Sequence, residues 1–122
     1  MDMMSVAKEL VAGCRENRAK ENLDKIYASD AVSVEAADMG QGRETKGLDG
    51  IKAKHDWWEN SMEMLDGDIT GPLPHGDDRF AVIFRVKAKE KATGEVTDME
   101  EVAVYTVKDG KIVREEFFYD MG

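Results

Sequence analysis

The last third of the chain carries apolar residues at every second position, and this alternation dictates a β-sheet. It runs through residues 80–87, 99–107 and 112–119. Thr93-Gly94 lies between the first two runs, and Asp109-Gly110 between the last two is a strong signal for a two-residue hairpin loop. The sequence therefore predicts three consecutive antiparallel strands at this end of the chain.

The part of the chain before residue 63 contains apolar residues that recur every three or four positions instead, as on one face of a helix. This spacing predicts three helices, over residues 5–14 with Ser5 as the cap, over 23–27 and over 48–62. The β-branched run 31–36 predicts a short strand.

Two segments carry turn signals. Residues 38–47 hold three glycines and predict a loop, while residues 67–78, with Pro72 and Pro74, predict a strand edge or a turn-rich connection. Helices followed by a mainly antiparallel sheet predict an α+β fold, and the absence of any linker predicts one domain over residues 1–122.

The composition excludes several classes of protein. Of 122 residues, 17 are Lys or Arg and 26 are Asp or Glu, so the net charge is −9, which argues against a nucleic-acid partner and against an anionic membrane surface. No apolar run reaches the roughly 18 residues of a membrane span, and the N-terminus lacks the layout of a signal peptide. With Cys14 as its lone cysteine, the chain is expected to be a cytoplasmic protein without disulfides.

Four short motifs occur in a familiar order along the chain: residues 27–32 (YASDAV), 47–51 (GLDGI), 109–113 (DGKIV) and 117–120 (FFYD). Together with the order of the predicted elements, they resemble the nuclear-transport-factor-2-like superfamily, which includes SnoaL-like polyketide cyclases and ketosteroid isomerases. The resemblance covers nearly the whole chain. It implies a cone-shaped sheet wrapped around a long helix and a deep pocket, and it is not specific for one chemistry.

The resemblance also suggests site residues. Glu35 falls where the isomerases keep a carboxylate base, and His55 matches a pocket tyrosine of the same enzymes. A desolvated carboxylate can abstract a proton next to a carbonyl, and histidine titrates near neutrality. The alternatives are a solvated Glu35 and a His55 at the edge of the core. Trp58, on the apolar stripe of its helix, is expected to line the pocket or the core.

The hairpin sets an expected register, because a two-residue loop pairs the strands symmetrically. Directly opposed residues share a sheet face. The expected pairs are Thr106 with Val113, Val104 with Glu115, Val102 with Phe117, and Glu100 with Tyr119. The resemblance places this face inside, so that Glu100, Val104, Glu115, Phe117 and Tyr119 line the pocket, and it places Tyr105 and Phe118 outside.

Two departures from the isomerase pattern stand out. Val104 occupies the position of a protonated aspartic acid, and no tyrosine lies near Val11 in the first helix. Ketosteroid isomerisation by the usual arrangement is therefore not expected. Clustered carboxylates raise one another's pKa values, which suits acid–base chemistry and equally suits the binding of a cationic or polyhydroxylated ligand.

These observations lead to two hypotheses. The first is a cofactor-independent enzyme acting on an apolar carbonyl or hydroxyl compound, with Glu35 as base and His55, Glu115 and Tyr119 as proton partners, beside the ligand-binding residues Trp58, Glu100, Val104 and Phe117. The second is a non-catalytic ligand-binding or dimerisation domain. No nucleotide-binding motif occurs, and His55 and His75 do not have the spacing of metal ligands.

The strand around residues 102–107 has almost no polar face, whereas helices can cover only one side of a sheet. A second copy of the chain on the outer face is the simplest cover, so we expect a homodimer through the convex face. The alternative is an exposed, half-apolar face without a partner.

Overall fold

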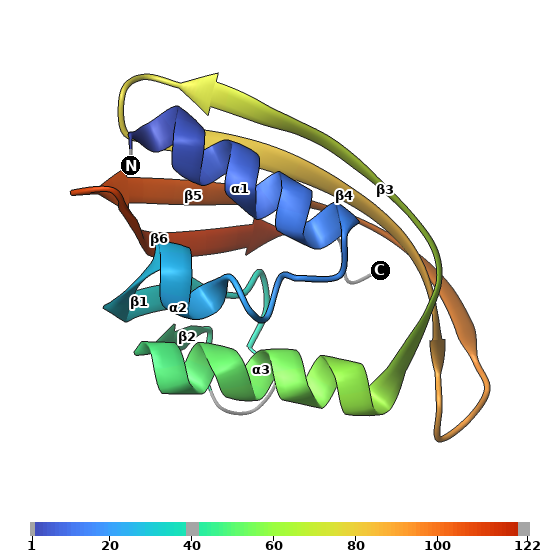
Figure 1. Ribbon diagram of the computed structural model, residues 1–122. Coiled ribbons are helices and arrows are strands. Elements are labelled where there is room, and N and C mark those ends of the chain that lie inside the picture. The colour runs from blue at the N-terminus through green and yellow to red at the C-terminus, as the bar shows by residue number, and fades with distance from the viewer. Residues whose placement is uncertain (1, 39–41, 120–122) are drawn as a thin grey trace.

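The computed structural model describes residues 2–38 and 42–119. These residues form three helices on one side of a six-stranded sheet (Figure 1). The elements in chain order are α1 (Met3–Arg15), α2 (Leu23–Ile26), β1 (Tyr27–Val34), β2 (Glu44–Lys46), α3 (Leu48–Ser61), β3 (Met62–His75), β4 (Arg79–Glu90), β5 (Val96–Lys108) and β6 (Lys111–Phe118). Residues 39–41 of the expected loop and Asp120 of the last motif lie outside the described residues.

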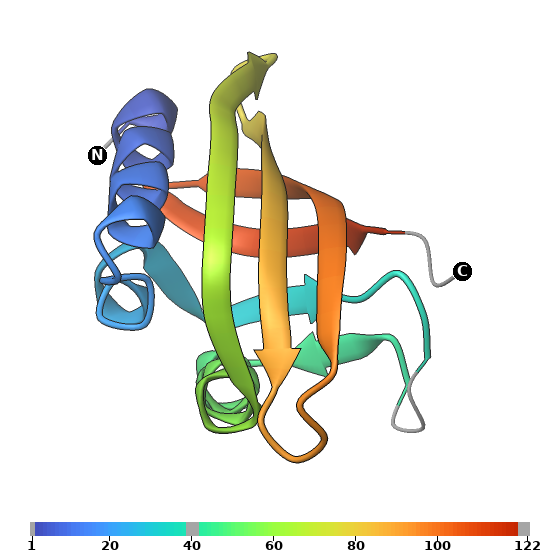
Figure 2. The ribbon, with the colours of Figure 1, turned by 90° about the vertical axis from the view of Figure 1, so that its right-hand side faces the viewer.

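The strand order is β2-β1-β6-β5-β4-β3, and neighbouring strands are antiparallel except β1 and β6, which are parallel. The long strands β3, β4 and β5 bend, so the sheet curls toward the helices (Figures 1 and 2). We call the face toward the helices the inner face and the opposite one the outer face. The predicted cone-shaped α+β fold is confirmed. In the described part of the chain, no helix is both long enough and apolar enough to span a membrane.

Helix α1 packs its apolar stripe on the inner face and closes the core. Val6, Leu10 and Val11 are buried against sheet residues that include Phe80 and Tyr105, whose rings stack with centroids 4.9 Å apart. The cap differs from the prediction. The Asp2 carboxylate accepts from the Ser5 backbone N–H at 2.8 Å, so Asp2 is the N-cap and Ser5 lies within the first turn.

The segment after α3 is a strand edge, one of the two alternatives that the sequence left open for residues 67–78, rather than a turn-rich connection. It is the 14-residue edge strand β3, which pairs with β4 from Met62 opposite Glu90 to His75 opposite Arg79. An edge strand tolerates proline because one side of it needs no ladder partner. Pro72 falls at an irregularity in the pairing between Thr70 and Leu73.

The β5–β6 hairpin has the predicted loop but not the predicted register. Lys108 pairs with Lys111 and Val107 with Ile112, and the next pair is Thr106 with Arg114. Val113 is therefore an extra residue, a β-bulge, and a bulge of one residue shifts every later pair. Glu115 lies opposite Tyr105 rather than Val104, and Phe117 opposite Ala103 rather than Val102.

The bulge decides which side chains share a face. Ala103 and Tyr105 are buried, and Glu115 on the partner strand is only 3% exposed, so these three lie on the inner face. Glu100 and Val104 alternate with them and lie on the outer face. The predicted inward positions of Glu100 and Val104 are wrong, as is the predicted outward position of Tyr105.

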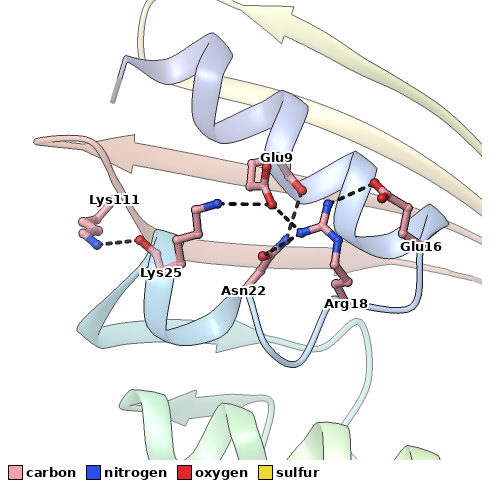
Figure 3. Close-up of polar contacts among 6 residues, drawn as sticks. All are labelled: Glu9, Glu16, Arg18, Asn22, Lys25 and Lys111. Atoms are coloured by element: carbon pink, nitrogen blue, oxygen red, sulfur yellow. Dashed lines mark hydrogen bonds and ion pairs between the residues drawn. The ribbon is translucent and has the colours of Figure 1, made fainter.

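A polar network fixes the turn between α1 and α2 (Figure 3). The Arg18 guanidinium donates to Glu9 at 2.7 Å and to Glu16 at 2.9 Å, and the buried Asn22 amide donates to the Glu9 carbonyl at 3.1 Å. The Lys25 ammonium lies 3.5 Å from the Glu9 carboxylate. These contacts hold the start of β1 in position, because β1 follows α2 directly.

Candidate functional site

A cluster of polar side chains lies on the inner face between the sheet and α3, and we call it the inner cluster. It comprises residues from β1 (Tyr27, Ser33), from the end of β1 (Glu35), from α3 (Lys54), from β5 (Glu101), from β6 (Glu115) and from just beyond β6 (Tyr119). Ser33 lies opposite Glu115 in the parallel pairing of β1 with β6, and Glu35 follows Ser33 by two residues. The two-residue period of a strand therefore turns Ser33 and Glu35 to the same face.

The buried end of the inner cluster is centred on Glu115. The Tyr27 hydroxyl donates to Glu115 Oε2 at 2.6 Å, and the Ser33 hydroxyl also bonds this carboxyl. Burial raises the pKa of Glu115, while the bonds from Tyr27 and Ser33 act in the opposite direction because they stabilise the carboxylate. Glu115 is thus a sheltered carboxyl with hydrogen-bond partners.

Lys54 connects the buried end to the accessible end. Its ammonium donates to Ser33 Oγ at 2.8 Å, forms an ion pair with Glu35 Oε1, and lies 5.4 Å from the centroid of the Phe117 ring. Glu35 Oε2 accepts from the Tyr119 hydroxyl at 3.0 Å, so both oxygens of Glu35 have partners. Burial and the bond to Glu35 raise the pKa of Tyr119 to about 12, so this phenol stays protonated as a donor.

Glu101 differs from the other two carboxylates of the inner cluster. Within residues 2–38 and 42–119 the Glu101 side chain has neither a hydrogen bond nor an ion pair. Burial, together with the charges of Glu35 and Glu115, raises the pKa of Glu101 to about 7, against a smaller opposing effect of Lys54. This carboxyl gains and loses a proton near neutral pH.

Apolar side chains continue the inner face beyond Glu101. Phe84 on β4 lies opposite Glu101, and Val86 lies opposite Met99, so the register turns all three toward the same side as Glu101. Each of the three is only half-buried. A free carboxyl therefore borders an apolar surface that is partly open.

No side-chain hydrogen bond or ion pair within residues 2–38 and 42–119 links His55 or Trp58 to the inner cluster. His55 is next to Lys54 on α3, and one step along a helix turns a side chain by roughly 100°. Burial lowers the pKa of His55, and the charges that affect it most are those of Glu59, Lys54, Asp56 and Lys20. Trp58 is half-buried and lies outside the core cluster of apolar residues.

The other predicted site residues divide between the two faces. Glu35, Glu115, Phe117 and Tyr119 come together on the inner face. On the outer face, the Glu100 carboxylate pairs with the Arg85 guanidinium at 3.2 Å. Val104 lines two shallow outer-face hollows of about 270 Å³ each, and neither hollow reaches the inner cluster or His55.

Sequence reasoning missed Tyr27, Ser33, Lys54 and Glu101. The alternation of β1 was a usable signal for Ser33, which shares a face with Glu35. The predicted register, which puts Glu100 on the face of Glu115, puts its neighbour Glu101 on the opposite face, and the bulge at Val113 that reverses this has no mark in the sequence. No group of three His, Cys, Asp or Glu side chains in the described ranges is arranged to hold a metal ion.

Comparisons with known proteins agree with this architecture. Residues 1–119 match the family model described as a SnoaL-like domain. A candidate SnoaL-like polyketide cyclase from Mesorhizobium loti has a crystal structure with a TM-score of 0.90 and 34% sequence identity, and the match covers 98% of this chain and 100% of that chain.

More distant structures share the fold at lower identity. A candidate isomerase from Bacillus subtilis matches with a TM-score of 0.77 and 18% identity, covering 98% of this chain and 90% of that one. A ketosteroid-isomerase-like protein from Catenulispora acidiphila, in complex with trimethylamine, matches with a TM-score of 0.66 and 15% identity, covering 86% of this chain and 75% of that one. Among curated proteins, none matches this chain.

Proposed function

The chain belongs to the SnoaL-like domain family, and on this premise we propose that it binds a small molecule on the inner face and transfers a proton on that molecule through Glu101. One observation carries the proposal. Glu101 is the carboxyl of the inner cluster without a partner among the described residues, and its pKa of about 7 suits a general acid or base at neutral pH.

The neighbours of Glu101 define the chemistry that it supports. In the proposed reaction, the Glu101 carboxylate accepts a proton from a carbon or hydroxyl group of the ligand. The Lys54 ammonium keeps one N–H beyond those that bond Ser33 and Glu35, and this N–H is the proposed donor for the oxygen on which negative charge develops. The half-buried Phe84, Val86 and Met99 provide contact for an apolar body, so the proposed substrate class is an apolar carbonyl or hydroxyl compound.

The role predicted for Glu35 as the base stays a prediction. Its two oxygens are already engaged by Lys54 and Tyr119, so neither can accept a proton from a ligand without breaking one of these contacts. We therefore give the proton-accepting role to Glu101 and a supporting role to Glu35. Glu115, buried at 3% exposure, is proposed to support the site without touching the ligand.

Elimination of 5-nitrobenzisoxazole tests this assignment without knowledge of the natural substrate. A base removes the C3 proton, the C–H electron pair forms the nitrile, and the N–O bond breaks to release a coloured phenolate. We expect a rate that rises with a midpoint near pH 7 and that falls about 100-fold in Glu101→Gln.

Glu100→Gln is the matched control, because it removes the same charge one residue away on the outer face. Its rate is expected to equal that of the unaltered chain. If Glu35→Gln abolishes the elimination and Glu101→Gln does not, then Glu35 is the base. If neither variant differs from Glu100→Gln, the proposed proton transfer is wrong.

Ligand binding without catalysis is the second candidate, and the charge of the inner cluster favours it. Three carboxylates face a single ammonium there, and the aromatic ring of Phe117 is already within reach of a cation. The complex of the Catenulispora acidiphila protein with trimethylamine suggests a probe. Chemical-shift changes at Glu101 and Phe117 on addition of trimethylammonium, with no elimination activity, would favour this candidate.

We also propose that the chain forms a homodimer through the outer face. Val102 and Val104 form an apolar strip there, and the exposed Phe118 extends it. Charges beside the strip are already paired within the chain, Arg85 with Glu100 and Arg114 with Glu116. A second copy with net charge −9 can approach such a balanced face with little repulsion.

Sedimentation at micromolar concentration tests this assembly. We expect twice the chain mass of 13.6 kDa, and a monomer for Val104→Glu. A mass near 13.6 kDa for the unaltered chain would contradict the homodimer.

A further inference from the structure

The contacts of Lys54 divide the carboxylates of the inner cluster into two kinds. Its ammonium contacts Glu35 directly and reaches Glu115 through the hydroxyl of Ser33. An ammonium has donors only, so Ser33 accepts from Lys54 and keeps its own proton for Glu115. Glu101 receives no such bond, although it belongs to the same cluster.

We propose that Lys54, besides its donor role toward the ligand, positions its neighbours and so decides which carboxyl of the inner cluster exchanges protons. It engages one oxygen of Glu35 and orients Ser33 onto Glu115, which leaves Glu101 as the carboxyl that is free to exchange a proton with a ligand. The inference rests on the proposed role of Glu101 and concerns how that role is assigned.

The placement of Lys54 follows from its helix. Ile51 is the buried residue of α3 and is fully enclosed in the core. Lys54 follows it by three residues, so both side chains lie on the same face of the helix. The buried Ile51 holds this face of α3 against the core, and the contacts of the Lys54 ammonium with Ser33, Glu35 and the Phe117 ring place it toward β1 and β6.

The charges around Glu101 show what Lys54 changes. The charged neighbours of Glu101 are Glu35 after β1, Glu115 on β6 and Lys54 on α3. The phenols of Tyr105 and Tyr119 are also near, and Phe84 on β4 lies opposite Glu101. Lys54 acts to lower the pKa of both Glu101 and Glu115. Without this cation, Glu101 keeps its neighbouring carboxylates and loses the positive charge that opposes them, and Glu35 loses the partner of one of its oxygens.

Carboxyl titration by carbon-13 NMR tests the inference, with Lys54→Met, Lys54→Arg and Lys52→Met compared with the unaltered chain. Lys52 is the matched control, because it lies on α3 and its ammonium pairs with Asp24 at 2.6 Å, away from the inner cluster. In Lys54→Met we expect the Glu101 titration to move upward by about one pH unit, because the positive charge that opposes its protonation is gone.

Lys54→Arg retains the charge and is expected to titrate like the unaltered chain, as is Lys52→Met. If Lys54→Met does not fold, Lys54→Gln replaces it, since its amide still donates to Ser33 and Glu35 without a charge. An unchanged Glu101 titration in the uncharged variant that folds would overturn the inference.

The elimination assay separates this inference from the proposed function. A shifted titration without elimination activity in any variant supports the role of Lys54 and rejects proton transfer by Glu101. Elimination activity whose pH midpoint stays the same in the uncharged variant rejects the role of Lys54 and retains that of Glu101.

Discussion

Two cations organise polar networks in different parts of the molecule. Arg18 binds Glu9 and Glu16 at the surface between α1 and α2 (Figure 3), and Lys54 binds Glu35 and Ser33 on the inner face. The surface network balances two carboxylates, Glu9 and Glu16, with two cations, Arg18 and Lys25. The inner cluster sets three carboxylates against one ammonium.

The difference separates a structural network from a chemical one. In the surface network each carboxylate has a cation, and the pKa of Glu9 is lowered, chiefly by its bond from Arg18. In the inner cluster three carboxylates have one ammonium between them. Burial is the largest cause of the raised pKa values of Glu101 and Glu115. A balanced network of this kind serves the fold, whereas the unbalanced and sheltered one has the raised carboxyl pKa values that the proposed proton transfer requires.

The largest effect on stability is expected from Tyr27→Phe. This change removes the donor of the 2.6 Å bond to Glu115 while the ring stays in the core, so a buried carboxyl loses a partner. We expect a loss of about 2 to 3 kcal/mol in the free energy of unfolding, measured in urea at neutral pH. Tyr119→Phe, at the accessible end, is the control and is expected to cost less than about 1 kcal/mol. Equal losses of unfolding free energy in Tyr27→Phe and Tyr119→Phe would mean that the buried bond from Tyr27 to Glu115 stabilises the chain no more than the accessible bond from Tyr119.

The two networks should respond to pH with opposite sign. For Glu101 the folded pKa of about 7 lies above the unfolded value near 4.5, so the folded state binds the extra proton between these values. Its stabilisation is complete below pH 4.5 and is lost as pH rises through about 7. For Glu9 the folded pKa is lowered, so its contribution is present above the unfolded pKa and is lost as pH falls through the folded one.

Glu101→Gln isolates the inner contribution to this pH dependence. At pH 8 the variant is expected to be about 2 kcal/mol more stable than the unaltered chain, which is less than the full shift implies because water reaches part of this carboxyl. Near pH 4 the two chains should be equally stable. Urea unfolding at both pH values measures the difference, and Glu100→Gln should show no such divergence.

A smaller effect is expected in the surface network from Asn22→Ala. The Asn22 amide is buried at 4% exposure and donates to the Glu9 carbonyl, so its removal should cost about 1 kcal/mol. Gly13→Ala disturbs the same contact without removing Asn22, because a Cβ at Gly13 would overlap the Asn22 amide. Thermal unfolding of both variants should show lower stability. Stabilisation by Gly13→Ala would show that Asn22 moves aside without loss.

The smallest effect is expected from Arg18→Met, since exposed ion pairs are weak and screened by salt. Its loss of stability should be below that of Asn22→Ala and should vanish in about 1 M sodium chloride. The loss in Tyr27→Phe should persist in the same salt, because the Tyr27–Glu115 bond is buried. A salt-independent loss in Arg18→Met would mean that Arg18 acts through packing.

The elements could be predicted wherever one periodicity dominated the sequence. The stripe from Leu48 to Trp58 gave α3, and the alternation after Phe80 gave β4. For residues 67–78 the sequence left a strand edge and a turn-rich connection open, because Gly67, Pro72 and Pro74 are signals for a turn, and only pairing with β4 decides for the strand. A local sequence pattern does not show whether a segment pairs with a strand that follows later in the chain.

The candidate site was less predictable, because small geometric steps decide it. Glu35, Glu115, Phe117 and Tyr119 reached the inner face as predicted, although their proposed roles stay untested. Neighbouring residues of a helix point roughly 100° apart, so the inner cluster contains Lys54 where the sequence suggested His55. The bulge at Val113 puts Glu101 rather than Glu100 on the inner face. Nothing in the alternation of residues 112–119 marks this bulge.

The sequence by itself determined the α+β class, the hairpin at Asp109-Gly110 and the family resemblance, because periodicity and turn chemistry are local properties. It also determined the surplus of carboxylates over cations. Only the tertiary structure decided which carboxylates meet. A single bulge in β6 and the anchoring of Ile51 bring Glu35, Glu101 and Glu115 around Lys54, and the protonation of such a cluster depends on distances and burial that no local pattern contains.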